Sequence, residues 1–267
     1  MRMHLDFTGR HVFVFGGTTG INFGIAQAFA RCGAHVSVAS RTRENVDAAL
    51  AALQSQGAQA CGVCADVRDF EAVGAAFAEA VQRFGPIDAL VSGAAGNFLC
   101  PANAMSANGF RSVVDIDLIG SFNVLRQAYA HLRKPGASLI NITAPQSMVA
   151  MRSQAHAAAA KAGVDQLTRV LALEWGADGI RVNAISPGPI DGTEGFRRLI
   201  ARTPEELAQA QRDVPMGRFG TIDDIANLAL FLASPHASYL SGAVIPCDGG
   251  GALDSVKPAL ERAALQP

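Results

Sequence analysis

Short apolar runs alternate with longer amphipathic stretches along most of the chain. The apolar runs have the length of buried strands, and the stretches between them carry apolar residues at helical spacing. Strands are expected at residues 11–15, 34–39, 59–65, 87–92, 138–142, 180–185 and 243–246. Helices are expected at residues 24–32, 42–56, 70–84, 108–132, 155–175 and 222–232.

This alternation is typical of right-handed βαβ units, which place parallel strands in one sheet with helices on both faces. We therefore expect an α/β fold, a single Rossmann-like doubly wound domain over residues 1–267 with a seven-stranded parallel sheet. No linker, repeat or low-complexity segment divides the sequence. A polar, arginine-bearing stretch at about 191–218 interrupts the pattern.

Composition supports one large core and excludes several partners. The 267 residues are 49% hydrophobic and 17% charged, unlike a disordered chain. The formal net charge of −1 gives no global basic field for nucleic acid. No apolar run reaches the roughly 18 residues of a membrane span, and no signal peptide is visible. The expectation is a cytoplasmic protein without a nucleic-acid partner.

The cysteines point to structure rather than to metal or redox chemistry. Cys61 and Cys64 form a CxxC, but it lies in a predicted buried strand, and no second pair accompanies it. An odd count of five suits a reducing compartment. We predict no metal site.

Glycine-bearing turns follow several predicted strands and indicate a dinucleotide site. After the first strand, GGTTGINFG permits close approach of the backbone to a pyrophosphate at a helix N-terminus. Similar turns follow the fourth and sixth strands, and Asp66 after the third can accept from an adenine amino group. The expected cofactor contacts are Gly16, Thr18, Thr19, Gly20, Asn22, Phe23, Gly24, Ser40, Arg41, Asp66, Val67, Ala94, Ala95, Gly96, Lys161, Pro187, Gly188, Pro189 and Ile190.

The end of the second strand predicts which nicotinamide cofactor binds. A carboxylate at this point usually accepts from the ribose 2′-OH of NAD. Here the chain reads Ser40-Arg41-Thr42-Arg43, a hydroxyl and two arginines suited to a 2′-phosphate. We therefore predict NADPH/NADP+; the alternative is a solvated basic turn.

Lys161 lacks the tyrosine that nicotinamide-dependent reductases usually place one helical turn before such a lysine. The residue at that position is Ala157, and the two tyrosines, Tyr129 and Tyr239, lie elsewhere in the sequence. In carbonyl reduction a phenol protonates the developing oxyanion, and alanine cannot. Simple alcohol or ketone chemistry is therefore disfavoured.

Taken together, the motifs resemble the short-chain dehydrogenase/reductase family over nearly the whole chain. They are GGTTGINFG, CADVRD, SGAAGNF, SLINIT, the Lys161 helix and IRVNAISPGPI. Within the family, residues 94–101, 115–117, 187–190 and 192–195, with His156 and Lys161, resemble the peroxisomal type of 2,4-dienoyl-CoA reductase, which also lacks the tyrosine. The mitochondrial type carries a tyrosine shortly after the fifth strand, where this chain reads APQS. The ending LQP is not a peroxisomal address.

The resemblance implies NADPH-dependent reduction of 2,4-dienoyl-CoA thioesters by a homotetramer, with a substrate loop at about 191–218. Asn97 would donate to the thioester oxygen, while Asp117 and Lys161 would work with water in protonating carbon. Each has a plainer interpretation: Asn97 as a turn cap, Asp117 paired with an arginine, and Lys161 on the surface. His156 is expected to pack, and Thr143 and Ser147 lie near the usual family serine position.

The resemblance also assigns contacts to the acyl-CoA substrate. They are Arg41, Arg68, Phe98, Ser106 and Arg198. Each arginine is alternatively a solvated surface charge. Two other functions stay open: a related reductase acting on another enoyl or carbonyl compound, and a catalytically silent protein that binds dinucleotide or CoA.

Overall fold

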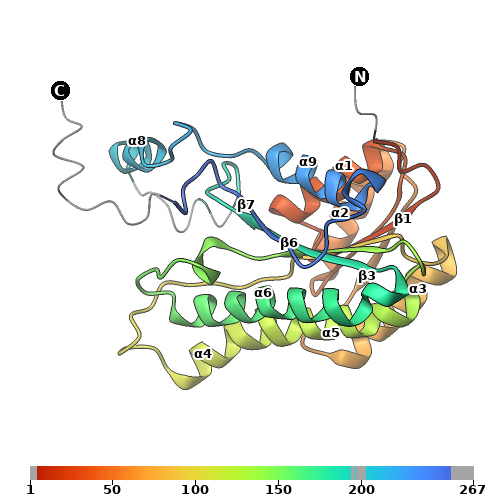
Figure 1. The fold of residues 1–267 in the computed structure, drawn as a ribbon, viewed down its shortest axis with the longest axis horizontal. Coiled ribbons are helices and arrows are strands. Elements are labelled where there is room, and N and C mark those ends of the chain that lie inside the picture. The colour runs from red at the N-terminus through yellow and green to blue at the C-terminus, as the bar shows by residue number, and fades with distance from the viewer. Residues whose placement is uncertain (1–4, 194–195, 197–202, 254–267) are drawn as a thin grey trace.

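In the computed structural model, residues 5–193, 196 and 203–253 are described, and they form one parallel sheet between two layers of helices (Figure 1). The strands are β1 (His11–Phe15), β2 (His35–Ser40), β3 (Ala60–Cys64), β4 (Ala89–Ser92), β5 (Ser138–Ile142), β6 (Arg181–Pro187) and β7 (Val244–Cys247). Their order is β3-β2-β1-β4-β5-β6-β7, with every pair parallel. The predicted doubly wound, seven-stranded fold is confirmed.

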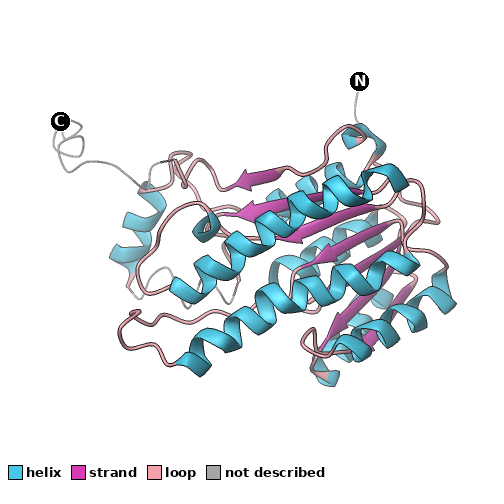
Figure 2. Cartoon of the chain, turned by 60° about the horizontal axis from the view of Figure 1, so that its bottom comes forward, coloured by secondary structure: helices cyan, strands magenta, loops and turns pink. Residues whose placement is uncertain are grey.

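Helices cover both faces of the sheet, and the strand arrows of Figure 2 all point towards the same edge. The helices are α1 (Gly20–Arg31), α2 (Arg43–Ser55), α3 (Phe70–Phe84), α4 (Ala107–Val114), α5 (Gly120–Ala128), α6 (Ala155–Trp175), α8 (Pro204–Arg212) and α9 (Ile222–Ala233). In Figure 1, α1, α2 and α9 lie above the sheet, and α3, α5 and α6 lie below it.

Each face of the sheet has its own hydrophobic core. Along β1, Val12 and Val14 point into one core, with Phe29 of α1, while Phe13 and Phe15 point into the other. There, both β1 rings pack on Phe77 of α3, with ring centroids 4.8 and 5.6 Å apart. Because side chains alternate along a strand, a fully buried run such as HVFVF can fill both cores at once.

The sheet order reverses at β1, which pairs with β2 on one side and β4 on the other. The turns after β1 and β4 therefore meet at the carboxyl edge of the sheet. Gly16 has a φ of +75°, and a Cβ there would lie 2.8 Å from the backbone nitrogen of Ala94. Only glycine permits this approach, which leaves a crevice where α/β folds bind ligands.

Three elements differ more from the expected ones than the one- or two-residue shifts seen at other ends. Helix α1 begins at Gly20 rather than at residue 24, because Gly16 and Gly17 complete the turn and the extended Thr19 precedes the helix. A π-helical turn, Asp115–Ile119, interrupts the helix expected at 108–132. The polar stretch at 191–218 contains α8, which begins after Thr203, whose side chain accepts from the backbone N–H of Glu206.

Candidate active site

A cavity of about 360 Å³ lies along the carboxyl ends of β1 to β4. Its walls include these residues predicted for the cofactor: Gly16, Thr18, Thr19, Asn22, Ser40, Arg41, Asp66, Val67, Ala94, Ala95 and Gly96. Asn22 donates from its amide to the Gly93 carbonyl at 2.7 Å, which joins the β1 turn to the β4 turn. Arg41 is exposed, and no ion pair with a described carboxylate engages it, whereas Arg43 pairs with Asp47 at 3.6 Å.

Three of the predicted cofactor contacts in the glycine motif lie outside this cavity. Gly20 is the first residue of α1, with a φ of +56°. Phe23 packs against the core shared by α1 and α9. A Cβ on Gly24 would collide with the side chain of Ile222 in α9. Gly20 therefore completes the turn into α1, and Phe23 and Gly24 allow α1 to pack on α9.

Asp66 and Arg68 bind each other at the end of β3. Arg68 Nε donates to Asp66 Oδ1 at 3.0 Å, and this hydrogen bond is the main cause of a lowered pKa of the carboxyl. Asp66 was expected to accept from adenine and Arg68 to contact CoA. In this structure each is engaged by the other, although both face solvent.

A second cavity, of about 480 Å³, lies over the ends of β4, β5 and β6. It contains the predicted residues Ala95, Asn97, Asp117, Lys161, Pro187, Gly188, Pro189 and Ile190. Ala95 lines both cavities, so they meet at the β4 turn. Ala157 lines the second cavity too, at the position of the missing tyrosine.

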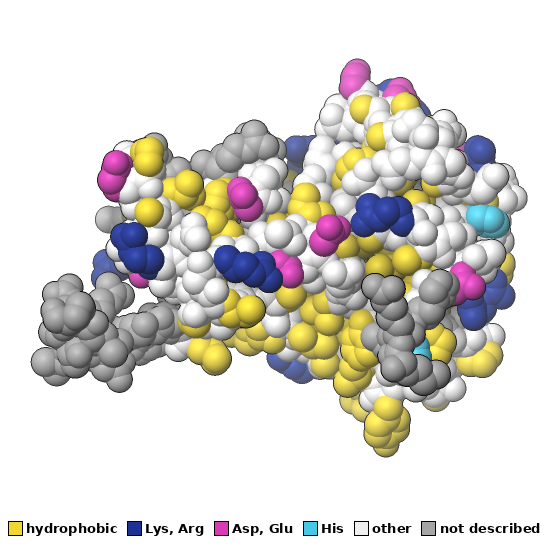
Figure 3. Space-filling model, turned by 90° about the horizontal axis from the view of Figure 1, so that it is seen from above, with side chains coloured by type: hydrophobic (Ala, Val, Ile, Leu, Met, Phe, Trp, Pro, Cys, Tyr) yellow, Lys and Arg dark blue, Asp and Glu magenta, His cyan; other side chains and the backbone are white. Residues whose placement is uncertain are grey.

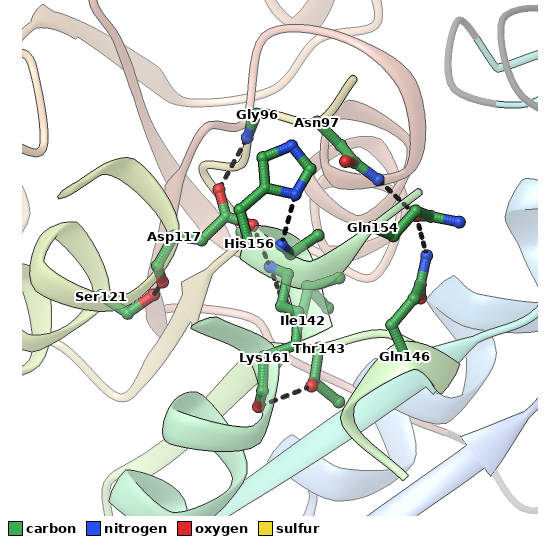
Figure 4. Close-up of polar contacts among 12 residues, drawn as sticks. Gly96, Asn97, Asp117, Ser121, Ile142, Thr143, Gln146, Gln154, His156 and Lys161 are labelled. Atoms are coloured by element: carbon green, nitrogen blue, oxygen red, sulfur yellow. Dashed lines mark hydrogen bonds and ion pairs between the residues drawn. The ribbon is translucent and has the colours of Figure 1, made fainter. Parts of the chain in front are cut away.

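Lys161 is buried beside this cavity and is held by two groups (Figure 4). Its ammonium donates to the carbonyl of Ile142, the last residue of β5, at 3.1 Å. It also pairs with Asp117 Oδ2 at 3.2 Å, and the two side chains are only 8% and 2% exposed. The surface-lysine interpretation is therefore wrong, and the partner of Asp117 is a lysine rather than an arginine.

Asp117 owes its inward orientation to the π-helical turn between α4 and α5. Its other oxygen, Oδ1, accepts from the backbone N–H of Gly96 at 2.7 Å, and its carbonyl accepts from Ser121 Oγ at 2.6 Å. One extra residue in a helical turn shifts the direction of the side chains that follow, and such turns often occur at functional sites. The carboxylate is therefore fixed by β4 and α6 together.

Three side-chain amides meet on one wall of the second cavity. Asn97 Nδ2 and Gln146 Nε2 both donate to Gln154 Oε1, each at 2.8 Å. Asn97 does not act as a turn cap in this arrangement. Gln154 was not predicted, but its spacing from Ala157 and Lys161 is i, i+3, i+7, which places the three on one helical face.

The neighbouring polar residues have mainly structural contacts. His156 is fully buried, accepts from the backbone N–H of Ala157 through Nδ1 at 2.8 Å, and packs edge-on against Phe98. Thr143 Oγ1 donates to the Lys161 carbonyl at 3.5 Å and lines the cavity. Ser147 Oγ is buried without a hydrogen-bond partner.

The predicted substrate residues are spread around the cavities rather than gathered in one. Phe98 is partly exposed on His156, and Ser106 caps α4 by accepting from the backbone N–H of Gly109 at 3.0 Å. Arg41 lines the first cavity and Arg68 the neighbouring surface. Arg198 lies outside the described residues.

Both tyrosines are remote from the second cavity. Tyr129 donates to Asp178 and packs on Trp175, with ring centroids 4.9 Å apart. Tyr239 is fully exposed and lies by a separate cavity lined by Arg181 and Ser234. Neither therefore substitutes for the phenol that position 157 lacks.

The described residues show no sign of a metal site or of a membrane span. On the face in Figure 3, lysine and arginine side chains lie apart, several beside acidic ones, rather than in one basic stripe. The described residues form no cluster of three metal-binding His, Cys, Asp or Glu side chains. Within the same residues, no helix has the length and apolar character needed to cross a membrane.

Comparison with known proteins shows the family of this chain. A crystal structure of a short chain dehydrogenase from Bacillus anthracis matches with a TM-score of 0.83 at 35% identity, covering 93% of this chain and 99% of that one. A family model described as enoyl-(acyl carrier protein) reductase matches residues 16–251. The chain belongs to the short-chain dehydrogenase/reductase family. It is an oxidoreductase of that family, whose Rossmann-like fold binds a nicotinamide dinucleotide.

Two similar members of the family carry the name predicted from the motifs. A peroxisomal 2,4-dienoyl-CoA reductase of Rattus norvegicus, named as (3E)-enoyl-CoA-producing, is 47% identical over 241 residues, covering 89% of this chain and 82% of the relative. A probable 2,4-dienoyl-CoA reductase of Bacillus subtilis, named as (2E)-enoyl-CoA-producing, is 40% identical over 242 residues, covering 90% and 95%. The predicted resemblance is confirmed.

Proposed function

We propose that this short-chain reductase uses NADPH to reduce 2,4-dienoyl-CoA thioesters to 3-enoyl-CoA products in the breakdown of unsaturated fatty acids. The observation that carries the proposal is the buried Lys161–Asp117 ion pair, facing a cavity in which Ala157 replaces the usual tyrosine. A site without a phenol is poorly suited to protonating a carbonyl oxygen. It is compatible with a reaction in which the proton goes to carbon.

The residues of the first cavity fit a phosphorylated dinucleotide. Gly16 lets the turn after β1 lie against the β4 turn beside the start of α1, and a helix N-terminus is suited to a pyrophosphate. Asn22 Oδ1, buried there without a partner, is available to accept from a ribose hydroxyl. Ser40 and Arg41 provide a hydroxyl and a guanidinium for a 2′-phosphate. When bound, the reduced nicotinamide supplies the hydride. Lys161, which lines the second cavity, would orient the nicotinamide ribose.

In the proposed reaction, the δ-carbon of the dienoyl chain accepts the hydride, and the π electrons move to the thioester oxygen as a dienolate. Asn97 stabilises that oxygen by donating from its amide. Protonation of the α-carbon then leaves a double bond between the β- and γ-carbons. Two of the three Lys161 N–H groups bind Ile142 and Asp117, which leaves the third to orient a proton-donating water.

The phosphates of CoA require positive charge near the cavity mouth. Arg41 and Arg68 are both exposed beside the first cavity and support this role. Phe98, Ser106 and Arg198 remain predicted substrate contacts by resemblance.

We also infer a cytoplasmic homotetramer. All five cysteines are free, as in a reducing compartment. Large apolar side chains are exposed on α4 to α6 and the π-helical turn, and association would bury them: Phe110, Ile119, Phe122, Val170 and Leu173. Light scattering should give the mass of four chains, and a monomeric mass would contradict this assembly.

The proposed activity is tested by mixing the protein with NADPH and 2,4-hexadienoyl-CoA and following the dienoyl absorbance. We expect the absorbance to fall, and chromatography against 2-enoyl and 3-enoyl standards should identify the 3-enoyl product. Turnover of other enoyl or carbonyl compounds but not of the dienoyl thioester would favour the related-reductase alternative. NADPH binding without turnover on any such compound would indicate a catalytically silent protein.

Replacing Arg41 with aspartate is expected to shift cofactor preference from NADPH towards NADH. Charge-assisted hydrogen bonds contribute about 1.5–3 kcal/mol, so the ratio of the two kcat/KM values should change by about 10- to 100-fold. Arg43→Asp is the matched control, because Arg43, the second arginine predicted for the 2′-phosphate, pairs with Asp47 and lies outside the cavity. An unchanged ratio in Arg41→Asp would refute the assignment of Arg41 to the 2′-phosphate.

A further inference from the structure

Gln154 is at the start of α6, yet its side chain does not cap the helix. The residue occupies the N-cap position, where a short side chain usually accepts from the first turn, and no such bond is formed. Instead, its Oε1 accepts from two amides, Asn97 Nδ2 and Gln146 Nε2, both at 2.8 Å. A carbonyl oxygen has two lone pairs, so one acceptor can hold both donors.

The backbone around Gln154 is held in an unusual conformation. Ser153 has a φ of +62°, a left-handed conformation that residues other than glycine rarely adopt. Its carbonyl accepts from the backbone N–H of Cys100 at 2.9 Å, which links the loop after β4 to the start of α6. Strain of this kind is retained mainly at functional sites. Here it directs Gln154 towards the cavity that Asn97 and Gln146 also line.

Among the described residues, Gln154 is the side chain that hydrogen-bonds the amides of both Asn97 and Gln146. The oxygens Asn97 Oδ1 and Gln146 Oε1 are buried without partners, so neither oxygen helps to orient its amide. An amide that rotates by half a turn exchanges its oxygen for its nitrogen at almost no change in shape. Because Gln154 Oε1 can only accept, it keeps both nitrogens on its own side, and each nitrogen retains a second hydrogen.

We propose that Gln154 is a positioning residue that arranges Asn97 and Gln146 as two amide donors for the thioester oxygen of the substrate (Figure 4). The inference rests on the proposed dienoyl-CoA reduction. It adds Gln146 as a second hydrogen-bond donor beside Asn97. Lys161 and Asp117 keep their proposed role in protonating the α-carbon. Donors fixed before the reaction stabilise a developing oxyanion without reorganising, and loss of one typically slows turnover by about 10²–10³-fold.

Three substitutions at position 154 and one elsewhere on the helix test this role. Gln154→Leu and Gln154→Met remove the acceptor, and each should lower kcat by about 10- to 100-fold with an unchanged KM for NADPH. Gln154→Glu keeps an oxygen acceptor and should retain kcat within about fivefold of the unsubstituted enzyme. Gln166→Leu, at an exposed position of α6, should have no effect. Thermal unfolding identifies any variant that fails to fold. If either the Leu or the Met variant does not fold, the other still tests the loss of the acceptor.

A double-mutant cycle shows whether Gln154 acts through Asn97. In an Asn97→Ala background, Gln154→Leu should lower kcat less than it does alone, because one of the two amides that it orients is already gone and only the effect through Gln146 remains. Additive effects, or equal losses in the Leu and Glu variants, would overturn the inference and leave the proposed function standing. If the unsubstituted protein does not reduce 2,4-hexadienoyl-CoA, the proposed function fails, and this inference fails with it.

Discussion

Lys161→Met is expected to reduce kcat for 2,4-hexadienoyl-CoA by about a thousandfold or more. The substitution removes the ammonium that we assign to proton transfer and to the ribose, and each such contribution is typically worth about 10²–10⁴-fold. Methionine has nearly the same length as lysine, so the cavity wall keeps its shape. Stopped-flow measurement of dienoyl absorbance at saturating NADPH gives the rate directly.

Lys134→Met is the matched control for this substitution. Lys134 lies over the ring of Tyr129, remote from both cavities, with its ammonium 3.2 Å from the ring centroid. It should leave kcat unchanged. A Lys161→Met enzyme that retains more than about a tenth of normal turnover would remove the lysine from the proposed chemistry.

Asp117→Asn is expected to lower both stability and turnover. Removing one partner of a buried ion pair leaves the other charge uncompensated, which costs about 3–5 kcal/mol. Water in the adjoining cavity can solvate Lys161, so we expect about 3 kcal/mol less free energy of unfolding, at the lower end of that range. Urea unfolding measures the loss, and kcat should fall at least about tenfold because the ammonium is no longer anchored.

Two further variants separate the ion pair from general effects of substitution. Asp115→Asn changes a carboxylate in the same π-helical turn that does not line the second cavity, and it should leave kcat unchanged. Combining Asp117→Leu with Lys161→Met replaces the pair by apolar side chains, which should restore much of the stability but none of the activity. An unchanged unfolding midpoint in Asp117→Asn would mean that the pair does not stabilise the fold.

The fold was predictable because its signals are local. Runs such as HVFVF are long enough to identify strands, and glycine turns identify the carboxyl edge of the sheet. Helix starts were less predictable: the start of α1 depends on how residues 16–19 meet the β4 turn, and that contact spans more than 70 residues of sequence. The π-helical turn at Asp115 gave no signal that helical periodicity detects.

Individual residues of the site could be predicted from the sequence, but the ion pairs and hydrogen bonds between them could not. Lys161 and Asp117 were identified separately, and their pairing depends on the register of β5 against β4 and on the π-helical turn. Gln154 was missed because a single glutamine before a helix belongs to no motif, and its importance comes from two loops that converge on it. Asp66 and Arg68 illustrate the converse: both were predicted as ligand contacts, yet two residues apart they bind each other.

The buried pair of Lys161 and Asp117 is neutral as a unit, so its electric field falls off quickly beyond the cavity. A polyanionic thioester approaching from solution is therefore attracted by exposed arginines such as Arg41, whose fields are screened beyond about 10 Å at 0.1 M salt. The pair itself, shielded from ions in solution, is screened much less. Added salt should consequently slow the capture of substrate while leaving the chemical step nearly unchanged, so the two halves of the catalytic cycle respond differently to the ionic strength of their surroundings.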